Sequence, residues 1–518
     1  MSGSFARRRY PEEDLTRIHK TALLLFLGLA CSYISLSPGS IVGQGYAGEE
    51  IDSGLRMLGA TTAFLKGRPV PPMVWSRHGP LPVVFDLPFL RLGKLVVSPD
   101  FMLSFEPCLL TAALITLLFL WLRKICTPGM SLFLALTAAF GTMLWPYAYI
   151  GLEPKQSFFV FLAGYLALAD GKIDHWPRLL LFALSCGLAL SLKTTGITLW
   201  PVIAYLIYFQ FHDNWSTKRR QLMVLAGIVI AIWLLGHWAT TRYLGAQGGA
   251  ASFRQWLIDS PLQFFVNLIG IFGSPSKGLF LYAPIMLVGL YAVPRAFRTH
   301  RPIAIYALLI VGCTLGLICL LTSPSDEVWG PRYMHTSIAP LMVCIGAAFP
   351  KFEWRKHFVL PVLTLIGVAV SFLGAFYYYG TIDFAAAKTG QNVMEWLTGD
   401  GSWNPIEFNV RLFRVYAFSK GTEPVVWTPR HTWVWTAPPN AIEWRSINLR
   451  EYCQPQSFLL RFWHAPKQGV ALKISTLYLA CLTLGVFFLV WVMVRSIKDQ
   501  RYMAALDYAP EITEAHAT

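Results

Sequence analysis

Three carboxylates lie within four residues of the stretch GQGYAGEEIDS, at Glu49, Glu50 and Asp52. Acids are scarce in this chain, which has 28 Asp plus Glu in 518 residues. A carboxylate held in one position can accept a proton from a hydroxyl group and act as a general base. The ordinary alternative is a solvated helix cap, because acids favour helix N-termini and the following SGLRMLGATTAFLKG has a helical pattern. The two interpretations are compatible, since a base also needs a fixed rotamer.

A second acid, Glu153, precedes an apolar run in YIGLEPKQSFF. Pro154 suits the first turn of a helix, so a simple cap is again the ordinary interpretation. Two acids from separate loops facing one site would either hold a divalent cation or divide the roles of base and binding group. We therefore take Glu153 as a candidate metal or acceptor ligand. The cofactor is left open, with Mg²⁺ or Mn²⁺ as the candidate cation.

Cationic side chains stand at the ends of other apolar runs, and these groups suit a phosphate at a membrane surface. They are Lys193 in LSLKTTG, Arg332 in WGPRYMH, and Arg77 and His78 in WSRHGPLP. The alternative is that each side chain extends to lipid headgroups. That alternative is weaker for Arg332, which stands between Gly, Pro and aromatic residues. We take all four as candidate phosphate ligands.

The chain that carries these residues is strongly apolar. It is 55% hydrophobic and 14% charged, with a mean hydropathy of +0.49, whereas soluble domains are about 25% charged. A membrane-spanning helix needs ~20 residues, so the pattern predicts an all-α polytopic membrane protein with about 12 transmembrane helices. The runs are 21–38, 102–122, 130–150, 156–170, 179–193, 196–211, 222–244, 278–294, 302–322, 337–349, 358–379 and 472–494.

Lys and Arg cluster in the N-terminal segment and in alternate short connections between these runs. The positive-inside rule then places both termini in the cytoplasm. Residues 39–101, 245–277 and 380–470 fall on the other side, as do the loops that carry Glu153 and Lys193. The net charge of +15 therefore sets membrane orientation and does not indicate nucleic acid. The nine Cys show no CxxC or Cys/His spacing, so neither a disulfide framework nor a zinc site is predicted.

The long outer segment 380–470 contains seven Trp with interleaved Arg. Its run VVWTPRHTWVWTAP alternates as strands do, which predicts a small mixed α/β or β-containing extracytoplasmic lobe. The Trp residues are interpreted as an interfacial belt with a small core, or as a platform on which sugars stack. The predicted domains are a transmembrane domain at 1–379 with a functional first outside loop at 39–101, the lobe at 380–470, and a final helix with a cytoplasmic tail at 471–518.

Six weak motifs follow one another over about residues 20–350. They are GEEIDSGLRMLGATTAFLKGR, WSRHGPLPVVFDLPFLRLG, LEPKQSFFVFLAGYLAL, LKTTGITLWPVIAYL, SPSKGLFLYAPIMLVGL and WGPRYMHTSIAPLM. In this order and with this sidedness the chain resembles the GT-C superfamily of polytopic glycosyltransferases, which includes protein O-mannosyltransferases and lipid A aminoarabinose transferases. The resemblance implies transfer of a sugar from a polyprenyl-phosphate donor to an extracytoplasmic lipid, glycan or protein, in one inverting displacement.

The resemblance also implies roles for residues. Glu49 falls at the family's catalytic Asp and Glu50 at its partner, while Glu153 takes the position of the second-loop acid. The chain has Glu where the family has Asp, and a misplacement of about 1 Å can cost about 100-fold in rate. Glu50 and Asp52 therefore stay as alternative bases, with Glu49 preferred. The cations named above would hold the donor phosphate.

Other functions remain as alternatives. A flippase or transporter of lipid-linked sugars places ionisable residues at mid-span, whereas the acids here stand at the outer ends of the runs. A non-catalytic protein of a cell-envelope glycan pathway, with 380–470 as a binding lobe, is the other alternative. The style of the motifs favours a bacterial inner membrane with a periplasmic active site.

Overall fold

The computed structural model describes most of the chain. The described residues are 12–39, 80–96, 98–149, 152–169, 171, 173, 175–246, 258, 260–274, 277–321, 329–351, 353, 357–377, 405–419, 424–427, 447–451 and 469–515.

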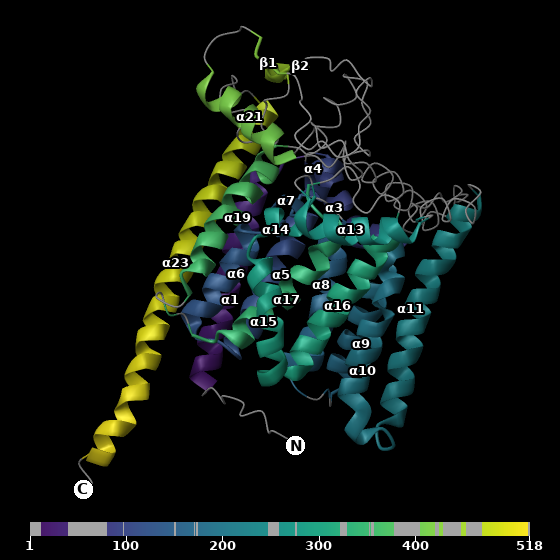
Figure 1. Cartoon of the computed structure of the whole chain (residues 1–518), viewed down its shortest axis with the longest axis vertical. Helices are drawn as coiled ribbons and strands as arrows, with labels where there is room; N and C mark the ends of the chain where they lie inside the picture. Colours follow the sequence, from purple (N-terminus) through teal and green to yellow (C-terminus); the bar gives the residue numbers. More distant parts are fainter. Residues whose placement is uncertain are drawn as a thin grey trace.

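The described helices form one bundle whose members run mostly along its long axis (Figure 1). Six of them are long and apolar enough to cross a membrane. These helices are α1 (Glu12–Leu36), α5 (Glu106–Arg123), α11 (Arg219–Ala246), α16 (Arg301–Leu320), α19 (Val359–Phe376) and α23 (Gly469–Ala515). The chain is therefore an integral membrane protein with several spans, as its composition predicts.

The other described elements are shorter. They are α3 (Pro80–Val96), α4 (Pro99–Leu103), α6 (Pro128–Phe140), α7 (Leu144–Tyr147), α8 (Leu152–Gly164), the π-helix η1 (Tyr165–Ala169), α9 (Trp176–Ser191), η2 (Thr194–Leu199), α10 (Trp200–Phe211), η3 (His212–Asn214), α13 (Pro261–Gly273), α14 (Leu279–Tyr282), α15 (Met286–Thr299), η4 (Arg332–Met334), α17 (His335–Ala348) and η6 (Leu449–Glu451). Every predicted apolar run contains helix. The count of about twelve spans stays a prediction, because several of these helices are shorter than a bilayer crossing requires.

Proline begins several of the helices. It occupies the first or second position of α5, α6, α9, α10, α13 and α16. Its fixed backbone angle suits the first turn, where the missing N–H would have no partner in the helix. At α13 the preceding Ser260 adds a side-chain cap, because its hydroxyl accepts a hydrogen bond from the backbone N–H of Leu262 at 3.2 Å.

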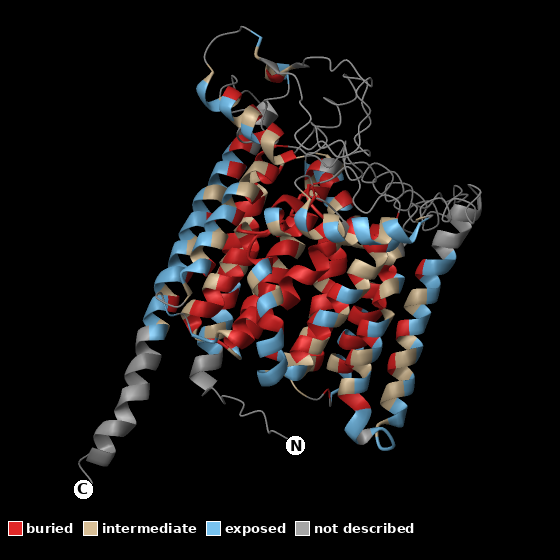
Figure 2. Cartoon of the chain, in the orientation of Figure 1, coloured by how far each residue is buried: buried red, intermediate tan, exposed pale blue. Residues whose placement is uncertain are grey.

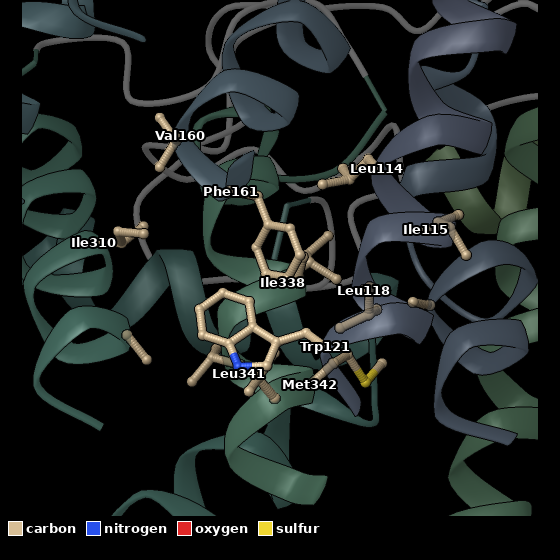
Figure 3. Packing of buried hydrophobic residues seen from close by; sticks show 14 of the residues in the cluster. Leu114, Ile115, Leu118, Trp121, Val160, Phe161, Ile310, Ile338, Leu341 and Met342 are labelled. Atoms are coloured by element: carbon tan, nitrogen blue, oxygen red, sulfur yellow. The ribbon is translucent and has the colours of Figure 1, made fainter. Parts of the chain in front are cut away.

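The core lies at the centre of the bundle, where buried residues concentrate (Figure 2). Every residue of α17 is buried. Trp121 of α5 packs against Phe161 of α8, with ring centroids 5.1 Å apart, in a buried cluster that also contains Leu341 and Met342 of α17 (Figure 3). In the apolar stretches of α11 and α23 only 17% of the residues are buried inside the protein. These two helices therefore present apolar side chains to lipid.

Glycine permits a close helix contact in this core. A Cβ at Gly346 of α17 would lie 2.5 Å from Cδ2 of Leu122 and 2.7 Å from Sγ of Cys126. Small residues let helix backbones approach closely in membrane proteins, where packing rather than water exclusion drives association. Gly346 thus sets the spacing between α17 and the end of α5.

The predicted outer lobe is described only in part. In 380–470 the structure describes α21 (Pro405–Phe418), η6 and an antiparallel pair of two-residue strands, β1 (Val426–Trp427) with β2 (Ile447–Asn448). Helix α21 is held to α19 by Asn409, whose Nδ2 donates to the carbonyl of Leu373 at 3.1 Å. Six of the seven Trp lie outside the described residues, so the mixed or β-containing lobe stays a prediction.

Candidate functional site

Three of the residues singled out in the sequence meet in space. Glu153 lies in the first turn of α8, Lys193 directly precedes η2, and Arg332 begins η4. Nζ of Lys193 lies 2.8 Å from Oε1 of Glu153, and Nε of Arg332 lies 3.8 Å from the same oxygen. Their side chains are only 5–12% exposed. One carboxylate therefore holds two cations, which is expected of charges taken out of water.

Tyr333 fixes the two cations further. Nζ of Lys193 lies 4.7 Å from the centre of the Tyr333 ring, and the guanidinium carbon of Arg332 lies 4.9 Å from it. Both distances suit cation–π attraction. The Arg332 guanidinium also donates a hydrogen bond to the Tyr333 hydroxyl at 3.1 Å. Tyr333 was not among the predicted site residues, although the motif WGPRYMH contains it.

These residues line a small pocket that is partly open to solvent. The lining residues are Glu153, Gln156, Ser157, Lys193, Thr195, Thr198, Leu199, Thr314, Leu317, Arg332, Tyr333, His335 and Thr336. Two cations and one carboxylate give the lining a net charge of +1 when the imidazole is neutral. Six of the lining side chains carry hydroxyl groups. A positive pocket rich in hydroxyl groups suits an anionic ligand that itself bears polar oxygens.

A serine and a histidine pair inside this pocket. Oγ of Ser157, one turn after Glu153 on α8, lies 2.6 Å from Nδ1 of His335 at the start of α17. The imidazole also packs edge-to-face on Tyr147, with ring centroids 5.3 Å apart. His335 is only 2% exposed. The pair was not predicted, because nothing in the sequence indicates that two residues so far apart touch.

A second buried charge cluster joins α8 to α3 and α5. Nζ of Lys155 lies 2.6 Å from Oδ1 of Asp86 and 3.5 Å from Oε2 of Glu106. The three side chains are 0–4% exposed. Positions 153 and 155 are about 200° apart around the helix, so Glu153 and Lys155 face opposite sides of the first turn of α8. This cluster was not predicted from the sequence.

The site lies at one end of the bundle. Helix α8 begins a few residues after α7, which lies at the same end as α21 (Figure 1). Helix α1 begins and α23 ends at the opposite end (Figure 1). The relative sidedness agrees with the predicted threading, whereas the orientation of the bundle in the membrane stays a prediction.

Five predicted site residues lie outside the described residues, namely Glu49, Glu50, Asp52, Arg77 and His78. Their predicted roles are therefore untested. Within the described part of the chain no group of three or more His, Cys, Asp or Glu side chains is placed to hold a metal. Glu153 already faces two cations within 4 Å, which disfavours a divalent cation beside it. Metal binding by Glu153 stays a prediction that needs ligands from outside the described residues.

Comparison with known proteins finds similarity only at the level of structure. No protein-family model matches the chain, and no curated protein does. A crystal structure of ArnT from Cupriavidus metallidurans bound to undecaprenyl phosphate is 14% identical, with a TM-score of 0.46, over 98% of this chain and 81% of that chain. The apo structure of the same protein is 16% identical, with a TM-score of 0.47, over 97% of this chain and 80% of that chain.

Proposed function

We propose that this chain is a membrane glycosyltransferase that moves a sugar from a polyprenyl-phosphate donor to an extracytoplasmic acceptor. The observation that carries the proposal is the convergence of Lys193 and Arg332 on Glu153 in a positive, hydroxyl-lined pocket at one end of the bundle. The order of motifs in the sequence supports the same reaction class. The acceptor is a lipid, glycan or protein, and the sugar is a hexose or a pentose.

The proposed reaction is a single inverting displacement. An acceptor oxygen attacks the anomeric carbon, the bond from that carbon to the phosphate oxygen breaks, and the electron pair leaves with the polyprenyl phosphate. The acceptor's proton passes to a carboxylate of the first loop, with Glu49 preferred over Glu50 and Asp52. This step leaves the departing phosphate with one more negative charge, so groups that stabilise the new charge lower the barrier.

Lys193 and Arg332 are the residues of the described site that suit this task. A cation held in place before the reaction stabilises developing charge better than a mobile one, because it needs no reorganisation. Glu153 and Tyr333 provide that fixation through the contacts given above. We therefore assign Glu153 to positioning the phosphate-binding cations. Arg77 and His78 are proposed as further phosphate ligands, and no step is routed through a metal ion.

A flippase or transporter of lipid-linked sugars is the alternative from another class. It would place its ionisable residues around a cavity at mid-span. In the described part of the chain, both charge clusters stand at the first turn of α8, which is the end of a helix. Catalysis at the membrane surface fits this placement better than passage through the bundle.

The test is transfer activity of the purified full-length protein. Radiolabelled polyprenyl-phosphate sugars are incubated with membrane acceptor lipids and the wild type, Glu49→Gln, Glu153→Gln or Lys193→Met. Removing one donor to a developing oxyanion costs about 100- to 1,000-fold in kcat, and we expect Lys193→Met to fall in this range. The matched control is Lys351→Met, an exposed lysine outside the pocket. Absence of transfer by the wild type with every donor would overturn the proposal. Wild-type activity of the Glu153 and Lys193 variants would overturn the site.

A further inference from the structure

His335 has one ring nitrogen engaged and one that is not. Nδ1 lies 2.6 Å from Oγ of Ser157, whereas Nε2 is buried and makes no hydrogen bond within the described part of the chain. The side chain lines the pocket that Lys193 and Arg332 also line. Buried polar atoms without partners are rare in folded proteins and call for a physical explanation.

The surroundings of the ring hold it in this orientation. Ser157 lies on one helix and Tyr147 packs edge-to-face on the ring from another. Rotation of the imidazole away from this orientation would break the bond to Ser157. The contacts with Ser157 and Tyr147 therefore hold the ring, and a ligand atom in the pocket is a partner that would satisfy Nε2.

We propose that His335 is a further ligand-binding residue, whose Nε2–H donates a hydrogen bond to a phosphate oxygen of the bound carrier. This inference rests on the proposed function. When the Ser157 hydroxyl donates to Nδ1, the single proton of the neutral ring is on Nε2. A neutral donor adds a hydrogen bond to the phosphate without adding a third positive charge beside Lys193 and Arg332. Ser157 then acts as a positioning residue that selects the tautomer.

Two substitutions separate this role from a structural one. His335→Gln places an amide group close to the position of Nε2, whereas His335→Asn places one close to Nδ1. If Nε2 binds the ligand, the Gln variant keeps the function and the Asn variant loses it. If the residue serves only to hold Ser157, the order is reversed. The two variants are similar in polarity, so each is the matched control for the other.

The measurement is the Kd of purified full-length protein for undecaprenyl phosphate. Undecaprenol and inorganic phosphate are tested in parallel, because they separate the lipid chain from the free anion as the source of affinity. A hydrogen bond to a charged group corresponds to about 10- to 100-fold in Kd. We expect that loss in His335→Asn, a change of less than about threefold in His335→Gln, and an intermediate loss in Ser157→Ala. Thermal unfolding of each variant shows that it is folded.

Other patterns of Kd would overturn the proposed contact between His335 and the phosphate. Equal Kd values for both His335 variants, or tighter binding by His335→Asn than by His335→Gln, would overturn the assignment of Nε2. Loss that appears equally with undecaprenol would overturn phosphate as the group contacted. If the folded wild type binds neither undecaprenyl phosphate nor inorganic phosphate, the proposed function fails and this inference fails with it. If the wild type binds undecaprenyl phosphate, the role of His335 is tested separately from the proposed function.

Discussion

Lys155→Met is the substitution whose effect on stability the structure predicts most directly. It removes the ammonium group that lies 2.6 Å from Asp86 and 3.5 Å from Glu106, and all three side chains are 0–4% exposed. Removing one partner of a buried ion pair costs about 3–5 kcal/mol, because the other charge is left buried without compensation. Here two carboxylates are left, so we expect a loss of about 5 kcal/mol.

Neutralising the carboxylates should reverse much of this loss. Asp86→Asn in the Lys155→Met background removes one of the two uncompensated charges, and Glu106→Gln removes the other. Replacing a buried ionic cluster as a whole by neutral groups is often close to neutral for stability. We therefore expect stability to rise from the single to the double to the triple variant. Asp86→Asn alone should destabilise the protein, since it weakens the hold on Lys155.

The assay is the free energy of unfolding of the full-length protein in mixed micelles, titrated with a denaturing detergent. Lys351→Met is the matched control, because Lys351 is exposed. A Lys155→Met protein within about 1 kcal/mol of the wild type would refute the reasoning, since surface charges rather than buried ones show such small effects. A triple variant no more stable than the single one would show that the loss comes from packing of the lysine chain.

Three further predictions concern other parts of the molecule. Tyr333→Phe keeps the ring that both cations approach, and it should raise the KM for the donor by less than about tenfold in steady-state kinetics. Tyr333→Leu removes the ring and should raise this KM more. Equal KM values for the two Tyr333 variants would argue against the cation–π contacts. Gly346→Ala should destabilise the protein by about 1–3 kcal/mol through overpacking, and Gly312→Ala, where a Cβ meets nothing within 4 Å, is its control. Cysteine placed at Ser98 should react with a membrane-impermeant maleimide in intact cells, whereas cysteine at Lys351 should not. The reverse pattern would invert the predicted orientation.

The helices were largely predictable because apolar runs near bilayer length have few alternatives to a helix inside a membrane. Helix α13 was not predicted, since it falls in the segment 245–277 that the threading treats as an outer connection. Its apolar sequence PLQFFVNLIGIFG has only 13 residues, which is short of a bilayer crossing.

The sequence by itself determined the membrane class, the places of the helices and the positions of Glu153, Lys193 and Arg332 at helix ends. Local composition sets all of these, since the length of an apolar run and the charges that flank it are properties of neighbouring residues in the chain. Only the tertiary structure decided which of these groups meet. Lys193 reaches Glu153 across 40 residues, and His335 reaches Ser157 across 178. Such contacts depend on how α8, α9 and α17 pack together, and no local pattern in the chain encodes that geometry.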